Sequence, residues 1–210
     1  QRFERKINKT PLEIYNHLRL SNPSPFMFYF NYGDFKILGS SPEILVRLRN
    51  NKITVRPIAG TRPRGKTKAQ DTKYKNDLLK DKKELSEHLM LLDLGRNDVG
   101  KVSKINTVKV TEKFNVEKYS HVMHIVSNVE GEFNNKYSIF ETLLSGFPAG
   151  TVSGAPKIRA MEIIDELEKN KRKLYAGGIG YFTSSKEFDT CITLRTALIK
   201  NNKFYVQSGA

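Results

Sequence analysis

Several features that define whole classes of protein are scarce or absent in this chain of 210 residues. It has a single cysteine, Cys191, so no internal disulfide can form, and such scarcity suggests a reducing compartment. No apolar run reaches about 18 residues, the length that a membrane-spanning helix requires. No signal peptide, internal repeat or low-complexity segment is visible. We therefore expect a single domain with one substantial core and no membrane helix.

The two ends of the sequence resemble cuts. The chain begins at Gln1 rather than at a methionine, and it stops at Ser208-Gly209-Ala210, directly after an apolar run. We therefore expect a fragment of a longer protein, truncated at both ends, whose missing start could have carried a leader segment.

Positive charge is in large excess, because 36 lysines and arginines face 22 aspartates and glutamates, for a formal net charge of +14. A basic stripe would neutralise nucleic-acid phosphates, so a nucleic-acid-binding module is one interpretation. The lysines are scattered, however, and often stand beside asparagine, as in Lys200-Asn-Asn-Lys203, a bias that AT-rich coding DNA produces. We favour a general lysine bias on solvated surface, which still helps to attract an acidic substrate.

Hydrophobic spacing and turn residues predict antiparallel hairpins at both ends of the chain and helices between them, an α+β pattern. Helices are expected over residues 11–20, 77–93, 137–145 and 156–169. Strands are expected over residues 26–32, 35–39, 43–49, 52–58, 106–112, 120–133, 174–183, 188–199 and 203–208. Residues 60–65 have the composition of a loop, and residues 66–76 are polar and expected to be mobile.

The run Phe147-Pro-Ala-Gly-Thr-Val-Ser-Gly-Ala-Pro156 is the most informative part of the chain. It combines turn-forming glycines with the hydroxyls of Thr151 and Ser153, and an amphipathic helix follows at once. A loop that opens a helix amino terminus attracts carboxylates and phosphates. Together with the block at residues 84–98, it indicates an enzyme that acts on an acidic small molecule.

Paired carboxylates stand on one predicted helix. Glu84 and Glu87 are three residues apart, so they share a face. Two such carboxylates can hold Mg²⁺ together with waters and a substrate carboxylate. A solvated helix face is the alternative, and spacing alone favours it. The following segment, from Leu91 to Asp98, is interpreted as a structural helix end in which Gly95 forms the C-cap.

Three further positions combine a reactive side chain with an apolar or glycine-rich setting. Glu43, in Gly39-Ser-Ser-Pro-Glu43, stands where a turn meets a strand, so desolvation could raise its pKa and suit a general acid; a surface strand-start residue is the alternative. His121 and His124 are three residues apart in a predicted strand, so at most one points into a site. Tyr175 precedes three glycines that allow a ligand to approach the backbone.

Arg195 is a charged residue inside the apolar run predicted as a strand over residues 188–199. Burying a guanidinium without a partner is costly. A carboxylate is therefore expected opposite it, supplied either by the protein as a structural ion pair or by a bound ligand.

These blocks, taken in order, resemble the chorismate-utilising enzymes and, among them, the large subunits of anthranilate synthase. The matching segments are Gly39-Ser-Ser-Pro-Glu43, Pro57-Ile-Ala-Gly-Thr-Arg-Pro-Arg-Gly65 and residues 84–98, 119–127, 147–168, 175–181 and 189–210. The resemblance implies an α+β fold of two large packed β-sheets with surrounding helices and the active site between them. Residues 1–210 would form the chorismate-binding catalytic domain, truncated at both ends. The fragment alone would be inactive, because further acidic Mg²⁺ ligands would follow Ala210.

The activity that the resemblance implies is that of a lyase, which converts chorismate and ammonia to anthranilate and pyruvate in tryptophan biosynthesis. Glu43 would be the general acid for the departing hydroxyl, and His124 would assist the later elimination. The residues implied to bind substrate carboxylates are Thr151, Tyr175, Arg195 and Gly209, and those implied to bind Mg²⁺ are Glu84 and Glu87.

The resemblance also implies a partner and an alternative. A glutamine amidotransferase subunit would supply the ammonia, and no nucleic acid or membrane would be bound. Aminodeoxychorismate synthases commonly carry lysine where this chain has Ala59, which favours the anthranilate branch without excluding the folate-pathway enzyme. The Lys, Asn and Ile bias fits a plastid-encoded gene, so the expected location is the plastid stroma or a bacterial-type cytoplasm.

Overall fold

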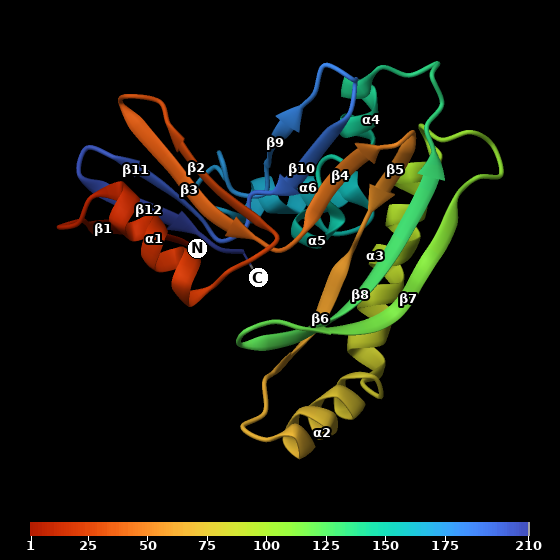
Figure 1. Ribbon diagram of the computed structural model, residues 1–210, viewed down its shortest axis with the longest axis horizontal. Coiled ribbons are helices and arrows are strands. Elements are labelled where there is room, and N and C mark those ends of the chain that lie inside the picture. The colour runs from red at the N-terminus through yellow and green to blue at the C-terminus, as the bar shows by residue number, and fades with distance from the viewer. Residues whose placement is uncertain (210) are drawn as a thin grey trace.

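The computed structural model describes residues 1–209, and Figure 1 shows its two antiparallel sheets lying side by side. Within these residues, five strands form the first sheet, in the order β1 (Arg2–Lys6), β12 (Lys203–Gln207), β11 (Thr196–Lys200), β3 (Phe35–Ser41) and β2 (Phe26–Asn31). Seven strands form the second sheet: β6 (Ile58–Pro63), β8 (Val122–Glu132), β5 (Lys52–Val55), β4 (Ile44–Arg49), β10 (Phe188–Ile192) and β9 (Gly178–Phe182) in order, with β7 (Lys109–Lys118) paired to β8.

Each sheet has its own helices. Helix α1 (Pro11–Ser21) packs on the first sheet, whereas α3 (Lys82–Gly100) crosses the second sheet and contacts β5, β6, β7 and β8. The shorter helices are α2 (Lys68–Leu78), α4 (Ile139–Ser145), α5 (Gly150–Ser153) and α6 (Lys157–Leu167). Local chemistry fixes their starts: Thr10 and Glu13 form a capping box on α1, and the Asp81 side chain accepts from two backbone N–H groups of α3.

The largest core lies between the second sheet and helices α3 to α5. Val46, Leu48, Ile53, Val99 and Phe188 are each at most 1% exposed there. Burying an aliphatic or aromatic side chain of this size contributes about 1.5–3 kcal/mol. This core gives the sheet a rigid helix-covered face, and residues that alternate to the other face are left available for chemistry.

The chain passes between the two sheets at two adjacent crossings, one from β3 to β4 and the other from β10 to β11. Backbone hydrogen bonds tie the crossings together: Ile192 N–H donates to the Glu43 carbonyl at 3.1 Å, and Ser40 N–H donates to the Arg195 carbonyl at 3.2 Å. The Ser41 hydroxyl adds a bond of 2.6 Å to the Ile192 carbonyl. Glu43 and Arg195, far apart in sequence, are therefore fixed at one junction.

The α+β class with two sheets is confirmed, and several local predictions are wrong. The loop expected over residues 147–156 contains helix α5, and the helix expected over residues 77–93 begins at the end of α2 and continues in α3. Four further predictions are also wrong. Residues 66–76 are largely helix α2, which Thr67 caps. The segment is polar because this helix buries few side chains, so its sequence lacks the apolar spacing that predicts a helix. Residues 60–65 mostly belong to β6, where Gly60 (φ +73°) lies in a register shift opposite β8. Gly95 lies within α3 rather than at its end, and the helix continues to Gly100 with Gly95 facing Val55 and Val129 of the second sheet. Arg195 lies between strands, at φ +47°, and not inside one.

Candidate active site

Glu43 is buried at the junction of the two sheets, with 4% of its surface exposed. The Thr151 hydroxyl donates to Glu43 Oε1 at 2.6 Å, and the Ile58 N–H approaches the same oxygen at 3.4 Å. Burial raises the pKa of Glu43 from 4.5 to about 8, although both hydrogen bonds act in the opposite direction. The carboxyl therefore keeps its proton at neutral pH, as a general acid must.

A buried ion pair joins α3 to α6 beside the cavity that Thr151, on α5, lines together with Glu43. Lys157 Nζ, at the start of α6, lies 2.7 Å from Asp98 Oδ2 near the end of α3, and Lys101 lies 2.9 Å from the other carboxylate oxygen. Glu43, Thr151 and Asp98 line one small cavity of about 30 Å³. Through Asp98, the segment from Leu91 to Asp98 anchors the start of α6, which follows the short helix α5 that carries Thr151.

His124 lies on β8 and meets β6 at Gly60 and Thr61. Its Nδ1 is 3.1 Å from the Gly60 carbonyl and 3.1 Å from the Thr61 hydroxyl. A carbonyl can only accept, so Nδ1 carries the hydrogen and Nε2 of the neutral ring is a free base. Burial lowers the pKa of His124, and the nearby Arg195 charge lowers it further. His121 is exposed, so only His124 has a site-like environment.

Arg195 has no acidic partner among residues 1–209. Its Nη1 donates to the Asn22 side-chain oxygen and to the Ser24 hydroxyl, both at 3.4 Å, and no carboxylate lies within ion-pair distance in this part of the chain. Burial lowers the pKa of the guanidinium. Of the two partners that the sequence left open, the structural ion pair is not formed within residues 1–209.

Tyr175 and Gly209 are brought together next to this junction. The Gly209 N–H donates to the Tyr175 hydroxyl at 2.9 Å, and the Arg172 guanidinium covers the Tyr175 ring at 5.4 Å. The loop that carries Tyr175 is bonded to the second crossing, because Thr193 N–H donates to the Gly177 carbonyl at 2.9 Å. Tyr175 and Arg195 are thus presented by hydrogen-bonded neighbouring segments.

The two carboxylates on α3 differ in setting. Glu84 is half-buried, 3.7 Å from Arg62 Nη1, and it approaches β6 at Gly60, the residue whose carbonyl holds His124. Glu87 is exposed, one turn further along, with no hydrogen bond or ion pair to residues 1–209. Within that range no cluster of three or more potential metal ligands exists. Two carboxylates on one face nonetheless suit Mg²⁺, which binds one or two carboxylates and completes its octahedron with water and substrate.

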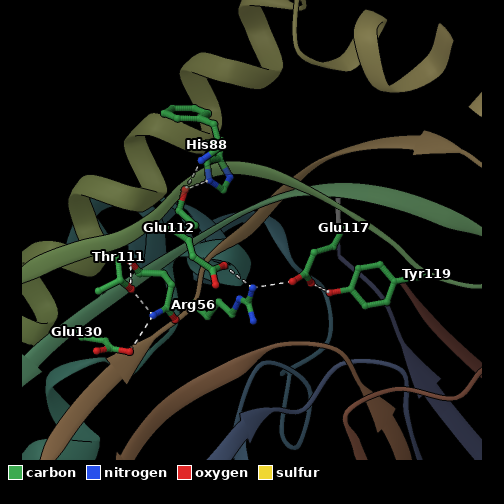
Figure 2. Close-up of polar contacts among 10 residues, drawn as sticks. Arg56, His88, Thr111, Glu112, Glu117, Tyr119 and Glu130 are labelled. Atoms are coloured by element: carbon green, nitrogen blue, oxygen red, sulfur yellow. Dashed lines mark hydrogen bonds and ion pairs between the residues drawn. The ribbon is translucent and has the colours of Figure 1, made fainter. Parts of the chain in front are cut away.

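One polar network near His124 was not predicted from the sequence (Figure 2). Arg56 Nη2 donates to Glu112 at 2.7 Å and to Glu117 at 2.6 Å, and the Tyr119 hydroxyl donates to the other Glu117 oxygen at 2.8 Å. Tyr119 packs edge-on against His124, with ring centroids 5.5 Å apart. The only sign of this network in the sequence is the pair of acidic residues on β7, and that pair does not identify Arg56 as the partner.

The buried Glu43 predicts a pH-dependent stability. The folded chain binds a proton that the unfolded chain releases above its ordinary pKa of 4.5, so unfolding becomes easier as pH rises toward about 8. Buried His88 acts in the other direction, but only below about its ordinary pKa of 6.5. Between pH 6.5 and 8 we expect the free energy of unfolding to fall, by at most about 1.4 kcal/mol per pH unit.

Urea unfolding of the chain and of Glu43→Gln across this pH range tests the expectation. The glutamine variant has no proton to lose, so its stability should stay nearly level. Equal slopes for the two proteins would show that Glu43 does not hold a proton in the folded state.

Comparisons with known proteins cover the whole chain. The chorismate binding enzyme family model matches residues 1–210. Anthranilate synthase component 1 of Cereibacter sphaeroides is 62% identical over all of this chain, and that of Neisseria meningitidis serogroup B is 57% identical. The chain spans only 42% and 43% of the length of these relatives.

A solved structure gives the same result for the fold. Anthranilate synthase component I from Streptococcus pneumoniae superimposes with a TM-score of 0.92 at 44% identity, over 100% of this chain and 46% of that one. No helix within residues 1–209 is long and apolar enough to cross a membrane. On the match of the whole chain to the family model, the identity to its relatives and the shared fold, this chain belongs to the chorismate binding enzyme family.

Proposed function

We propose that this chain is the catalytic region of an anthranilate synthase large subunit, a lyase that forms anthranilate and pyruvate from chorismate and ammonia in the tryptophan pathway. One observation carries the proposal: a protonated, buried Glu43 lies at the same sheet junction as Arg195, a cation with no carboxylate partner among residues 1–209. A dicarboxylic substrate that must lose a hydroxyl requires both groups. The names of the relatives favour this member of the family.

In the proposed reaction, Glu43 is the proton donor and His124 is the base. Glu43 gives its proton to the C4 hydroxyl, which leaves as water while ammonia adds at C2. Loss of the enolpyruvyl group as pyruvate, with removal of the C2 proton, then restores the aromatic ring. The free Nε2 of His124 is suited to this second stage, because Nδ1 already bonds to Gly60. Thr151 holds Glu43 in place.

Substrate carboxylates are assigned to the remaining cluster. Arg195 and Tyr175 grip the pyruvyl carboxylate, and the Thr151 hydroxyl and the Gly209 N–H contact a substrate carboxylate once their hydrogen bonds to Glu43 and Tyr175 open. Glu84 and Glu87 would hold Mg²⁺, which when bound neutralises the ring carboxylate and orients the ring. Their shared helix face and hard oxygen donors support this assignment.

The remaining parts of the proposal concern the whole protein. A glutamine amidotransferase subunit would deliver ammonia, and residues 1–210 would form one catalytic domain. The bacterial origin of the relatives favours a bacterial-type cytoplasm over the plastid stroma.

Product analysis tests the proposal. The product of the complete reading frame containing this chain, given chorismate, Mg²⁺ and ammonium, should release fluorescent anthranilate and an equal amount of pyruvate. A product that keeps its enolpyruvyl group, with no pyruvate, would identify aminodeoxychorismate synthase instead. Failure to consume chorismate, with salt-dependent binding to nucleic acid, would favour the basic binding module.

A further inference from the structure

Arg56 holds a carboxylate on each side at the break between β5 and β6. Its Nη2 donates to both Glu112 and Glu117 (Figure 2), and its side chain is only 29% exposed. Both partners lie on β7, so one guanidinium fixes two points of that strand. Charge-assisted bonds of this length are the strong ones. Glu117 is therefore held in one orientation.

Glu117 and His124 lie directly opposite each other in the pairing of β7 with β8, and Thr61 lies opposite His124 on β6. Opposed residues in antiparallel strands point to the same face of a sheet. Glu117, His124 and Thr61 therefore form a row across three strands, on the face away from the buried neighbours of His124, Met123 and Ile125, which pack with the helices.

Tyr119 connects this row to the reacting groups. Its hydroxyl donates to Glu117 at 2.8 Å, and its ring stands edge-on to the His124 ring. Its backbone is held as well, because Arg64 Nη1 donates to the Tyr119 carbonyl at 2.5 Å. Burial and the bond to Glu117 raise the pKa of the Tyr119 phenol, and Tyr119 opposes the effect by which burial lowers the pKa of Arg195.

We propose that Tyr119 is a positioning residue for His124, and that Glu117 and Arg56 hold its hydroxyl in place. The Tyr119 ring supports one side of the imidazole while Gly60 and Thr61 fix Nδ1 on the other, so the imidazole cannot turn. Nε2 then keeps a constant direction. The inference rests on the proposed function for its kinetic consequence, but not for the orientation of the imidazole.

Three variants of the protein made from the complete reading frame distinguish the contributions of the Tyr119 hydroxyl, the Glu117 charge and the Tyr119 ring. Tyr119→Phe keeps the ring and removes the bond to Glu117, Glu117→Gln keeps the shape and removes the charge, and Tyr119→Leu removes the ring. Tyr181→Phe is the matched control, because that hydroxyl only accepts from Arg49 on the exposed surface. Misplacing a reacting group by about 1 Å costs up to about 100-fold in rate.

We expect Tyr119→Phe and Glu117→Gln to lower kcat by about tenfold and Tyr119→Leu by up to about 100-fold, with KM for chorismate within about twofold of wild type. Tyr181→Phe should be unchanged. In ¹⁵N-histidine spectra, assigned with His124→Gln, His124 should show a single Nδ1–H tautomer in wild type and a mixture in Tyr119→Leu. Circular dichroism would confirm folding; should Tyr119→Leu not fold, Tyr119→Phe and Glu117→Gln still test the proposal.

The proposal is overturned if the Tyr119 and Glu117 variants match Tyr181→Phe in kcat, or if kcat falls while the His124 spectrum stays that of wild type. A wild-type protein that makes no anthranilate refutes the proposed function instead, and the tautomer measurement then tests the positioning of His124 by itself.

Discussion

In the protein made from the complete reading frame, Glu43→Gln is expected to lower kcat for the proposed formation of anthranilate by about 100- to 10,000-fold, the contribution of a positioned general acid. Glutamine keeps the size of the side chain and can still bond to the Thr151 hydroxyl, but it has no proton to give. Chorismate binding should therefore be largely retained. Steady-state kinetics with ammonium as the nitrogen source measure both kcat and the KM for chorismate. Equal losses in kcat and in binding would indicate a structural role for Glu43.

The pH profile gives this prediction a second readout. Since burial raises the pKa of Glu43 to about 8, the wild-type rate should fall as pH rises through that value and the acid loses its proton. The residual rate of Glu43→Gln should lack that decline. Glu162→Gln makes the same chemical change on the exposed surface of α6 and is the matched control, for which we expect wild-type kinetics.

Arg195→Ala is expected to raise KM for chorismate by about 30- to 5,000-fold, which corresponds to the roughly 2–5 kcal/mol lost when one member of a buried charge pair is removed. Among residues 1–209 the guanidinium makes only two long hydrogen bonds, and both are to neutral groups. It can therefore still pair with a ligand carboxylate. Arg195→Lys keeps the positive charge but loses the planar guanidinium, so its KM for chorismate should lie between those of wild type and Arg195→Ala.

Stability measurements separate this role from a structural one. No carboxylate among residues 1–209 is left unpaired when Arg195 is removed, so Arg195→Ala should leave the free energy of unfolding nearly unchanged. Arg159→Ala, on the exposed face of α6, is the control for loss of one positive charge. A normal KM together with a marked loss of stability would contradict the assignment of Arg195 to substrate binding.

Prediction from sequence succeeded where local chemistry decides the structure. The hairpin formed by residues 26–32 and 35–39 and the helices expected over residues 11–20 and 156–169 all follow from the preferences of a few adjacent residues. It failed where a contact distant in sequence overrides composition. Residues 60–65 have a loop-like composition, yet pairing with β8 makes most of them a strand.

The candidate site shows the same division. Glu43 and Arg195 were singled out because a charge stood in an apolar setting, and the residue types implied an acid and an anion binder. The sequence could not show that Arg195 lacks a protein carboxylate, nor that Arg56, Glu117 and Tyr119 converge on His124. These facts depend on strand register and on which segments meet, and neither is a local property.

The sequence by itself determined the chemical groups, the helix caps and turns, and the alternation that makes one sheet face apolar, because each depends on neighbours within a few positions. Only the tertiary structure decided that two crossings meet, that Thr151 reaches Glu43 across 108 positions of the chain, and that burial keeps Glu43 protonated. Desolvation depends on everything packed around a group, and such packing exists only after distant segments have come together.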